Sequence, residues 1–144
     1  MNTPKPVIIV ADDDSDDRML IKEALEATGF AGWIRFAADG QELLEILADG
    51  NLCPSLIILD LNMPRMDGRE ILKELKQDNE RRSIPILIHS TCNSTEEIEN
   101  CYNHGVNSYL VKPASFEELK ENLREVIQYW FETAQLPEKK SCSR

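Results

Sequence analysis

The sequence lacks a basic surface, a long hydrophobic run and a targeting segment. Its 144 residues include 26 acidic and 16 basic side chains, which gives a formal net charge of −10. Proteins that bind DNA or RNA need a basic footprint for the phosphate backbone, so the composition argues against a nucleic-acid partner. No apolar run approaches the roughly 20 residues that cross a bilayer, and residues 1–6 contain no signal-peptide core. We therefore expect a cytoplasmic protein that binds neither nucleic acid nor membrane.

Paired-cysteine motifs and a glycine-rich phosphate loop are also absent. The cysteines, which show neither a C-x-x-C pair nor a zinc-like spacing, are Cys53, Cys92, Cys101 and Cys142. Such scattered positions favour reduced thiols in a cytosolic protein. Without the glycine-rich loop, the sequence does not imply a bound nucleotide. The content of 42% hydrophobic residues is typical of a globular chain, and the length favours one domain.

Short apolar runs alternate with helical patterns five times along the chain. Several helical patterns begin at capping boxes, of which Ser94–Glu97 and Ser115–Glu118 are the clearest. Repeated strand-helix order with right-handed crossovers predicts a doubly wound α/β fold, a five-stranded parallel sheet with helices on both faces. The expected strands are Val7–Ala11, Trp33–Ala37, Leu56–Leu59, Pro85–His89 and Val106–Val111.

The aliphatic run Leu56–Leu59 leads directly into Asp60. Such a run is typical of a strand that is buried on both faces of a parallel sheet. Because burial of a lone carboxylate is costly, we expect Asp60 to lie at the end of the strand, where a cleft opens. Open α/β sheets bind their ligands at that carboxyl edge.

Polar residues that follow the strands should meet at this edge. Besides Asp60, they are Asp12, Asp13, Asn62, Ser90, Thr91 and Lys112. Three carboxylates close together repel one another, and Mg²⁺, a hard cation with oxygen ligands, would offset that repulsion. A lysine and a hydroxyl at the same edge suit phosphoryl oxygens. The set predicts phosphoryl transfer, with Asp60 as the nucleophile that forms an acyl phosphate.

Together and at these intervals, the residues resemble the receiver domain of two-component response regulators over roughly residues 5–130. The motifs that carry the resemblance are Asp12-Asp13, Asp60 within Leu-Asp-Leu-Asn-Met-Pro-x-Met-Asp-Gly, Ser90, Tyr109 and Lys112-Pro113. The resemblance implies the flavodoxin-like strand order 2-1-3-4-5, for which a receiver domain is itself a standard example.

The resemblance also implies roles for individual residues. Asp60 would accept a phosphoryl group from a phosphohistidine on a histidine kinase or a histidine phosphotransfer protein. Asp13 and Asp60 would bind Mg²⁺ directly, together with the backbone carbonyl of Asn62, and Asp12 would act through water. Lys112 would pair first with Asp60 and then with the phosphoryl oxygens.

Switching and regulation follow from the same resemblance. Ser90 would move to the phosphoryl group and Tyr109 would swing inward, altering the surface of the fourth helix, fifth strand and fifth helix. Thr91 stands where many receivers have a small alanine, so we expect it to slow access to the phosphoryl site. The Lys112-Pro113 peptide bond is expected to be cis.

The resemblance further implies a domain division and an assembly. Residues 1–132 would form the receiver domain and residues 133–144 a tail, with no DNA-binding output domain. The residues from Tyr129 to Pro137 are similar to the extended last helix of phytochrome-associated single-domain regulators. We therefore expect a homodimer through the side of the fifth helix.

Other interpretations remain open from the sequence. An Mg²⁺-dependent phosphatase with an aspartyl nucleophile needs a similar set, but it usually has a second acid where this chain has Asn62, which cannot transfer a proton in that way. A receiver-shaped docking module that is never phosphorylated is a third reading. Asp14, Asp16 and Asp17 are interpreted as helix N-terminal charges that favour the macrodipole.

Overall fold

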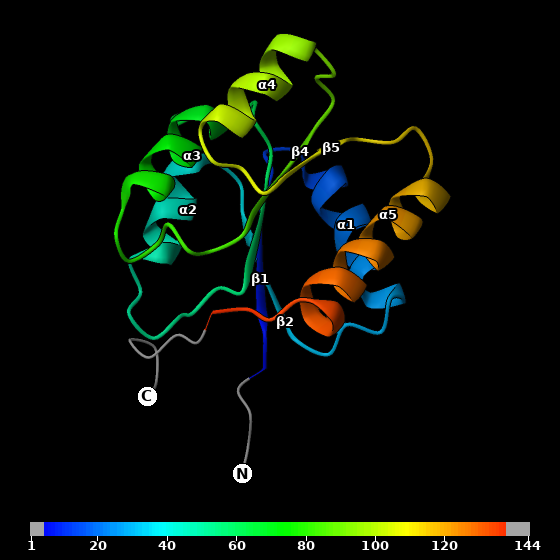
Figure 1. Ribbon diagram of the computed structural model, residues 1–144. Coiled ribbons are helices and arrows are strands. Elements are labelled where there is room, and N and C mark those ends of the chain that lie inside the picture. The colour runs from blue at the N-terminus through cyan, green and yellow to red at the C-terminus, as the bar shows by residue number, and fades with distance from the viewer. Residues whose placement is uncertain (1–4, 138–144) are drawn as a thin grey trace.

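Five parallel strands form one sheet in the order β2-β1-β3-β4-β5, which confirms the predicted topology. The computed structural model describes residues 5–137. Figure 1 shows the strands edge-on between two layers of helices. The strands are β1 (Val7–Ala11), β2 (Trp33–Ala37), β3 (Leu56–Leu59), β4 (Ile86–Ser90) and β5 (Ser108–Val111).

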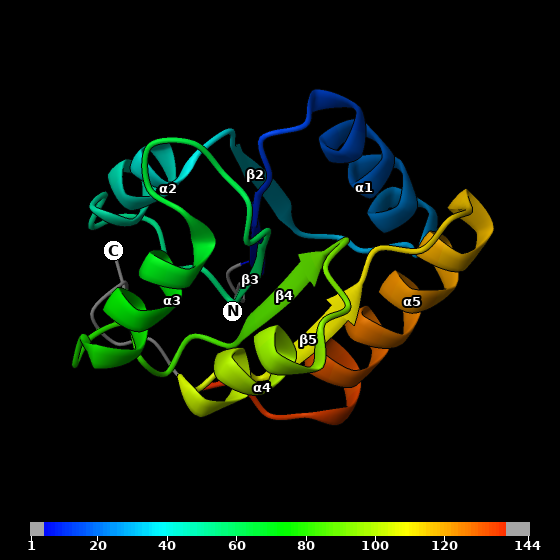
Figure 2. The same cartoon turned by 90° about the horizontal axis from the view of Figure 1, so that it is seen from above.

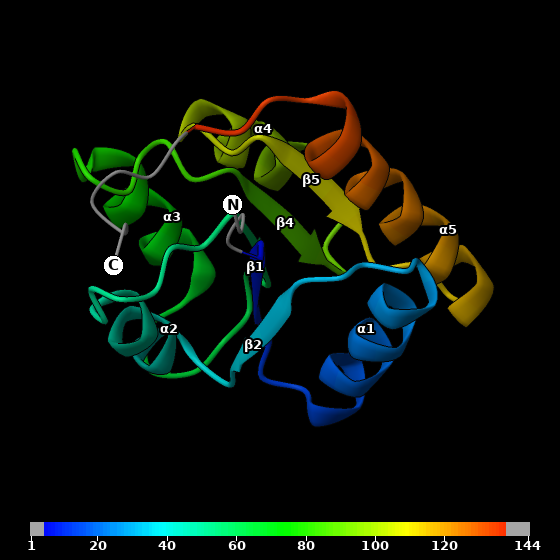
Figure 3. The ribbon, with the colours of Figure 1, turned by 90° about the horizontal axis from the view of Figure 1, so that it is seen from below.

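The helices cover both faces of the sheet, with α1 and α5 on one face and α2, α3 and α4 on the other (Figure 2). From below, α1 and α5 again lie side by side (Figure 3). The helices are α1 (Ser15–Ala27), α2 (Gly40–Leu47), α3 (Gly68–Gln77), α4 (Thr95–Asn103) and α5 (Phe116–Gln128), and a π-helical turn η1 (Tyr129–Thr133) follows.

The central strands are apolar on both faces because helices cover both. Every residue of β1, β3 and β4 is buried. Ile9 and Leu59 belong to the apolar cluster under α2 and α3, whereas Ile8 and Ile58 belong to the cluster under α1 and α5. Burial at about 25 cal/mol per Å² of apolar surface makes these two clusters the main source of stability.

Side-chain caps start every α-helix where the sequence places a short polar residue. Each cap accepts a hydrogen bond from a backbone amide in the first helical turn, which satisfies a group that the helix leaves unpaired. The caps are Asp14, Asp39, Asp67, Ser94 and Ser115.

Some boundaries and one thiol differ from the sequence predictions. β5 begins at Ser108 rather than Val106. Cys92 and Cys101 are free thiols, but Cys53 is disulfide-bonded, so the prediction of reduced thiols was wrong there. Disulfides depend on distances in the folded chain, which spacing in the sequence does not reveal. The predictions for Cys142 and for residues 138–144 of the tail fall outside the described residues.

Membrane-spanning segments were not expected from the sequence. Among residues 5–137, none of the helices combines the length and hydrophobicity that crossing a bilayer requires.

Candidate functional site

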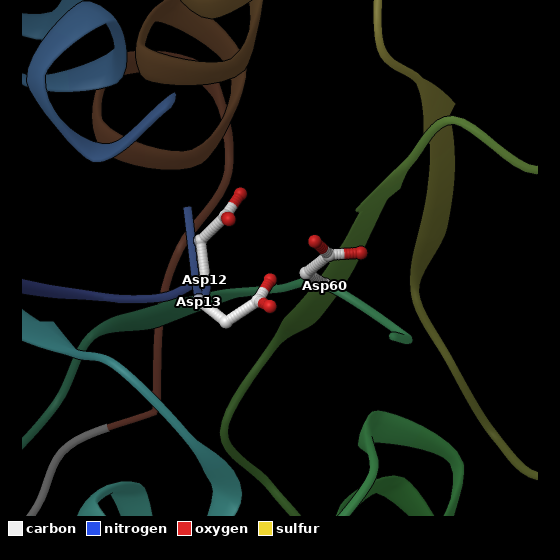
Figure 4. Close-up of side chains that lie close together, drawn as sticks. All are labelled: Asp12, Asp13 and Asp60. Atoms are coloured by element: carbon white, nitrogen blue, oxygen red, sulfur yellow. The ribbon is translucent and has the colours of Figure 1, made fainter. Parts of the chain in front are cut away.

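Three aspartates meet at the carboxyl edge of the sheet (Figure 4). One carboxylate oxygen from each of Asp12, Asp13 and Asp60 lies within 4.8 Å of the others. Asp12 and Asp60 are only 2% and 6% exposed, while Asp13 is open to solvent. The group therefore forms an acidic cluster with one side open to solvent.

The sheet itself aligns two of these carboxylates. The Asp60 amide donates to the carbonyl of Ala11 at 2.9 Å, and the Asp12 amide donates to the carbonyl of Ala37 at 3.0 Å. These bonds continue the parallel ladders past the last strand residues. Because β1 and β3 are neighbours, residues just beyond their ends emerge side by side.

The start of α3 closes the other side of Asp60. The Gly68 amide donates to the carbonyl of Leu61 at 2.8 Å. A Cβ atom at Gly68 would overlap the carbonyl oxygen of Asp60, so glycine permits this close approach. The Asn62 amide also donates to Oδ1 of Asp60 at 3.3 Å, which fixes the carboxylate from the loop side.

Lys112 follows β5 and supplies the only ammonium recorded in contact with the cluster within residues 5–137. Its Nζ lies 2.9 Å from Oδ2 of Asp12, 3.1 Å from Oδ2 of Asp60 and 2.7 Å from Oδ2 of Asp17. Burial lowers the pKa of Lys112, but hydrogen bonds to Asp17 and Asp12 outweigh it and raise the pKa above its usual value. The lysine is therefore charged across the physiological range.

The acidic cluster has the donor chemistry of a site for a hard divalent cation. Burial raises the pKa of Asp12, and the bonds from Lys112 and the Asp14 amide only partly oppose that shift. A cation that takes carboxylate and water oxygens would relieve the cost of holding these charges together. The oxygens of Asp12, Asp13 and Asp60 fit Mg²⁺, since the open side at Asp13 leaves room for water.

The predicted hydroxyls lie on β4 and β5. Ser90 is fully buried at the end of β4, where its Oγ accepts a bond from the Cys92 amide at 3.2 Å. The Tyr109 hydroxyl donates to the carbonyl of Cys92 at 2.7 Å, and burial raises its pKa to about 12. Both side chains thus hold the loop between β4 and α4. Thr91 is exposed in that loop.

One predicted feature of the site, the cis peptide bond, is wrong in this structure. No cis peptide bond occurs within residues 5–137, so the bond between Lys112 and Pro113 is trans. The trans form is the intrinsically favoured isomer even before proline, which makes it the default where nothing enforces the alternative.

Two residues beside Lys112 were given no role in the site from the sequence. Asp17 was interpreted as a helix-end charge, yet it makes the shortest of the three lysine contacts. His89 is 4% exposed, and neither ring nitrogen has a hydrogen-bond partner among the described residues. Burial, followed by the charge of Lys112, lowers the pKa of His89 to about 4. The signal for His89 in the sequence is its place as a polar residue within an otherwise apolar strand.

Comparisons with known proteins agree with this geometry. Residues 8–124 match the family model described as "Response regulator receiver domain". The probable methanogenesis regulatory protein FilR2 of Methanothrix harundinacea is 37% identical over 128 residues, covering 86% of this chain and 83% of that protein. The response regulator Rcp1 of Synechocystis is 31% identical over 141 residues, covering 94% of this chain and 95% of that protein.

Solved structures are similar over nearly the whole chain. The Mn²⁺-bound form of Rcp1 has a TM-score of 0.85 at 30% identity and covers 92% of this chain and 99% of its own. The phosphorylated cyanobacterial phytochrome response regulator RcpA has a TM-score of 0.87 at 33% identity, with coverage of 93% and 99%. The chain therefore belongs to the response regulator receiver domain family of two-component signalling.

Proposed function

We propose that this protein is a phosphoacceptor in a phosphorelay. Asp60 takes a phosphoryl group from a phosphohistidine on a histidine kinase or a histidine phosphotransfer protein. The observation that carries the proposal is the Asp60 carboxylate at 3.1 Å from the Lys112 ammonium and within 4.8 Å of the oxygens of Asp12 and Asp13. Phosphoryl transfer requires chiefly positioning and charge neutralisation, and this arrangement supplies both.

Mg²⁺ is the cofactor that suits the acidic cluster. Asp13 and Asp60 would hold it directly with the carbonyl oxygen of Asn62, and Asp12 would act through water. The ion supplies positive charge beside the oxygens of the incoming phosphoryl group. Support comes from the oxygen-only donor set and from the related Rcp1, whose structure was determined with Mn²⁺ bound.

The transfer forms one bond and breaks one. A carboxylate oxygen of Asp60 attacks phosphorus, the bond from phosphorus to the donor imidazole nitrogen breaks, and that nitrogen keeps the electron pair and takes a proton. Lys112 then contacts the phosphoryl oxygens with a charged donor. Asp60 is 6% exposed, so the acceptor oxygen is shielded from bulk water.

Ser90 and Tyr109 would transmit phosphorylation to the α4-β5-α5 surface. The two side chains share the loop after β4 through their bonds to Cys92. Movement of Ser90 toward a phosphoryl group would disturb that loop and release the Tyr109 hydroxyl. Tyr102 on α4 and Val111 on β5 are 50% and 40% exposed, which gives this surface apolar side chains for a protein partner.

Domain limits and assembly complete the proposal. Residues 1–132 would act as the receiver domain, with residues 133–144 as a tail, in a cytoplasmic protein. A homodimer through the α5 side fits the exposure of Tyr129, which is 54% accessible beside Trp130. Sedimentation analysis at increasing concentration tests this: a single monomeric species at every concentration would rule the dimer out.

Intact-mass spectrometry tests the phosphoacceptor role. The protein is incubated with Mg²⁺ and acetyl phosphate, and the mass of one phosphoryl group should appear on the wild type. Asp60→Asn should abolish the adduct, whereas Asp16→Asn, which makes the same charge change at an exposed position of α1, should retain it. An equal adduct on Asp60→Asn, or no adduct on the wild type from acetyl phosphate or a phosphohistidine protein, would overturn the proposal.

A further inference from the structure

Lys112 has three carboxylate acceptors, and one of them lies outside the proposed metal site. Asp12 and Asp60 belong to the acidic cluster, whereas Asp17 comes from the first turn of α1. The contact between Lys112 Nζ and Asp17 Oδ2, at 2.7 Å, is shorter than those to Asp12 and Asp60 at 2.9 and 3.1 Å. Nothing in the phosphoacceptor mechanism uses this third acid.

The donor capacity of Lys112 is fully engaged in this arrangement. A lysine ammonium has three N–H groups and no acceptor. Three carboxylates lie within ion-pair distance of Nζ, one for each N–H. Phosphoryl oxygens on Asp60 can take over the N–H that Asp60 itself holds, but they gain a second bond from Lys112 only when Asp12 or Asp17 gives one up.

Asp17 is the acceptor that can give up the ammonium most readily. Its side chain is 34% exposed, compared with 2% for Asp12 and 8% for Asp60. It also borders a cavity of about 90 Å³ beside Lys112 and His89. Water can therefore hydrate Asp17 when the ammonium moves, whereas loss of the lysine would leave Asp12 as a buried charge without that partner.

We infer that Asp17 is a positioning residue that competes with the phosphoryl group for the Lys112 ammonium and so lowers the affinity of the phosphoryl site. The inference rests on the proposed function. Before phosphorylation, the ion pair with Asp17 holds the Lys112 ammonium toward α1. After phosphorylation, the ammonium moves to the phosphoryl oxygens and water hydrates Asp17. The strength of the contact between Asp17 and Lys112 therefore sets how strongly Lys112 stabilises the phosphorylated form.

The test measures binding of beryllofluoride, a tetrahedral analogue of a carboxylate-bound phosphoryl group, at saturating Mg²⁺. Amide NMR shifts report the dissociation constant. Asp17→Asn and Asp17→Ala should bind the analogue about two- to fivefold more tightly than the wild type, which is the size of a partly exposed ion pair. Asp17→Glu, which keeps the charge within reach of Lys112, should return binding toward the wild-type value.

Asp16→Asn is the matched control, because it removes the same charge from the same turn and is exposed. It should change the dissociation constant less than Asp17→Asn does. Unchanged or weaker binding in both Asp17 variants, or an equal gain in Asp16→Asn, would overturn the role of Asp17 while leaving the proposed function intact. No Mg²⁺-dependent binding by the wild type would overturn both.

Discussion

At the scale of single residues, His89 is the least expected feature of the molecule. It lies on β4, and the cavity beside it is lined by Leu20 and Ile21 of α1 and Phe116 of α5. Both ring nitrogens are buried without a hydrogen-bond partner in the part of the chain that the structure describes. A buried polar group of this kind costs about 1–3 kcal/mol and calls for a neutral ring or a bound water.

Acid should destabilise the folded protein through His89. The folded-state pKa of His89 is about 4, below the ordinary value of 6.5, so the unfolded chain binds the extra proton between these values. Stability should therefore fall as pH drops from 6.5 toward 4, by up to about 3 kcal/mol from this group. Urea unfolding of wild type and His89→Leu at both pH values measures the difference.

The chain's other histidine supplies the control. His104→Gln should lose as much stability in acid as the wild type does, because His104 lies at the end of α4 and its ring contacts the carbonyl of Asn100. The same loss of stability in His89→Leu as in the wild type would show that another group causes it.

Some residues of the site could be predicted from the sequence and others could not, for a structural reason. Asp12 and Asp60 directly follow apolar strands of a parallel sheet, so their meeting required only the topology. Lys112 follows β5 in the same way. The contacts of Asp17 and His89 could not be predicted from the sequence. They depend on how α1 and α5 pack on β4, and periodicity does not specify that packing.

At the scale of elements, the start of α3 controls the backbone around Asp60. Gly68 is the first residue of α3 and is buried against the carbonyl of Asp60. Asp67 caps the same helix and pairs with Arg69, which also contacts Glu97 of α4 at 2.6 Å. Movement at this helix start would therefore reach both the phosphoacceptor and α4.

Gly68→Ala should destabilise the fold and disturb Asp60 together. The added Cβ overlaps a backbone oxygen that cannot move without shifting the end of β3, and overpacking of this kind costs about 1–3 kcal/mol. Thermal unfolding and acetyl phosphate labelling measure the two effects. Glu74→Ala, at an exposed position of α3, is the control and should change neither. Full labelling and full stability in Gly68→Ala would refute the tight contact.

The cap of α1 gives a separate test of an element. Oδ1 of Asp14 accepts bonds from the amides of Asp16 and Asp17 at 2.8 and 3.3 Å. Asp14→Ala should cost about 1 kcal/mol and increase hydrogen exchange in the first turn of α1. Asp14→Asn, which keeps a capping oxygen, should lose much less. Equal losses would mean that charge, rather than the cap, stabilises the helix start.

Element types were easier to predict than element ends. Polar caps and apolar periodicity identified the helices correctly. The π-helical turn Tyr129–Thr133 was not foreseen, because an ordinary helical stripe continues through Trp130 and Phe131. Phe131 packs against Phe30 with ring centroids 5.3 Å apart, which draws η1 toward the residues after α1. Such a contact depends on tertiary packing, which the helical periodicity of the sequence does not specify.

At the scale of the whole molecule, the formal net charge is −10. Because negative charges repel one another in the folded protein, binding of a cation should increase the free energy of unfolding. An ion that binds the acidic cluster only in the folded state stabilises the fold by about 2.7 kcal/mol at a concentration about 100 times its dissociation constant. Millimolar MgCl₂ should therefore raise the melting temperature above that in NaCl of equal ionic strength. Asp13→Asn should abolish the difference, and an equal effect of both salts on the wild type would indicate general screening.

The central claim is that Asp60, and no other carboxylate of the acidic cluster, carries the phosphoryl group. Borohydride reduction converts an acyl phosphate on aspartate into a stable alcohol, which peptide mass spectrometry can locate. After treatment with Mg²⁺ and a phosphoryl donor, the reduced residue should be Asp60 alone. Reduction at Asp12 or Asp13, or phosphorylation that borohydride leaves unchanged, would contradict the account.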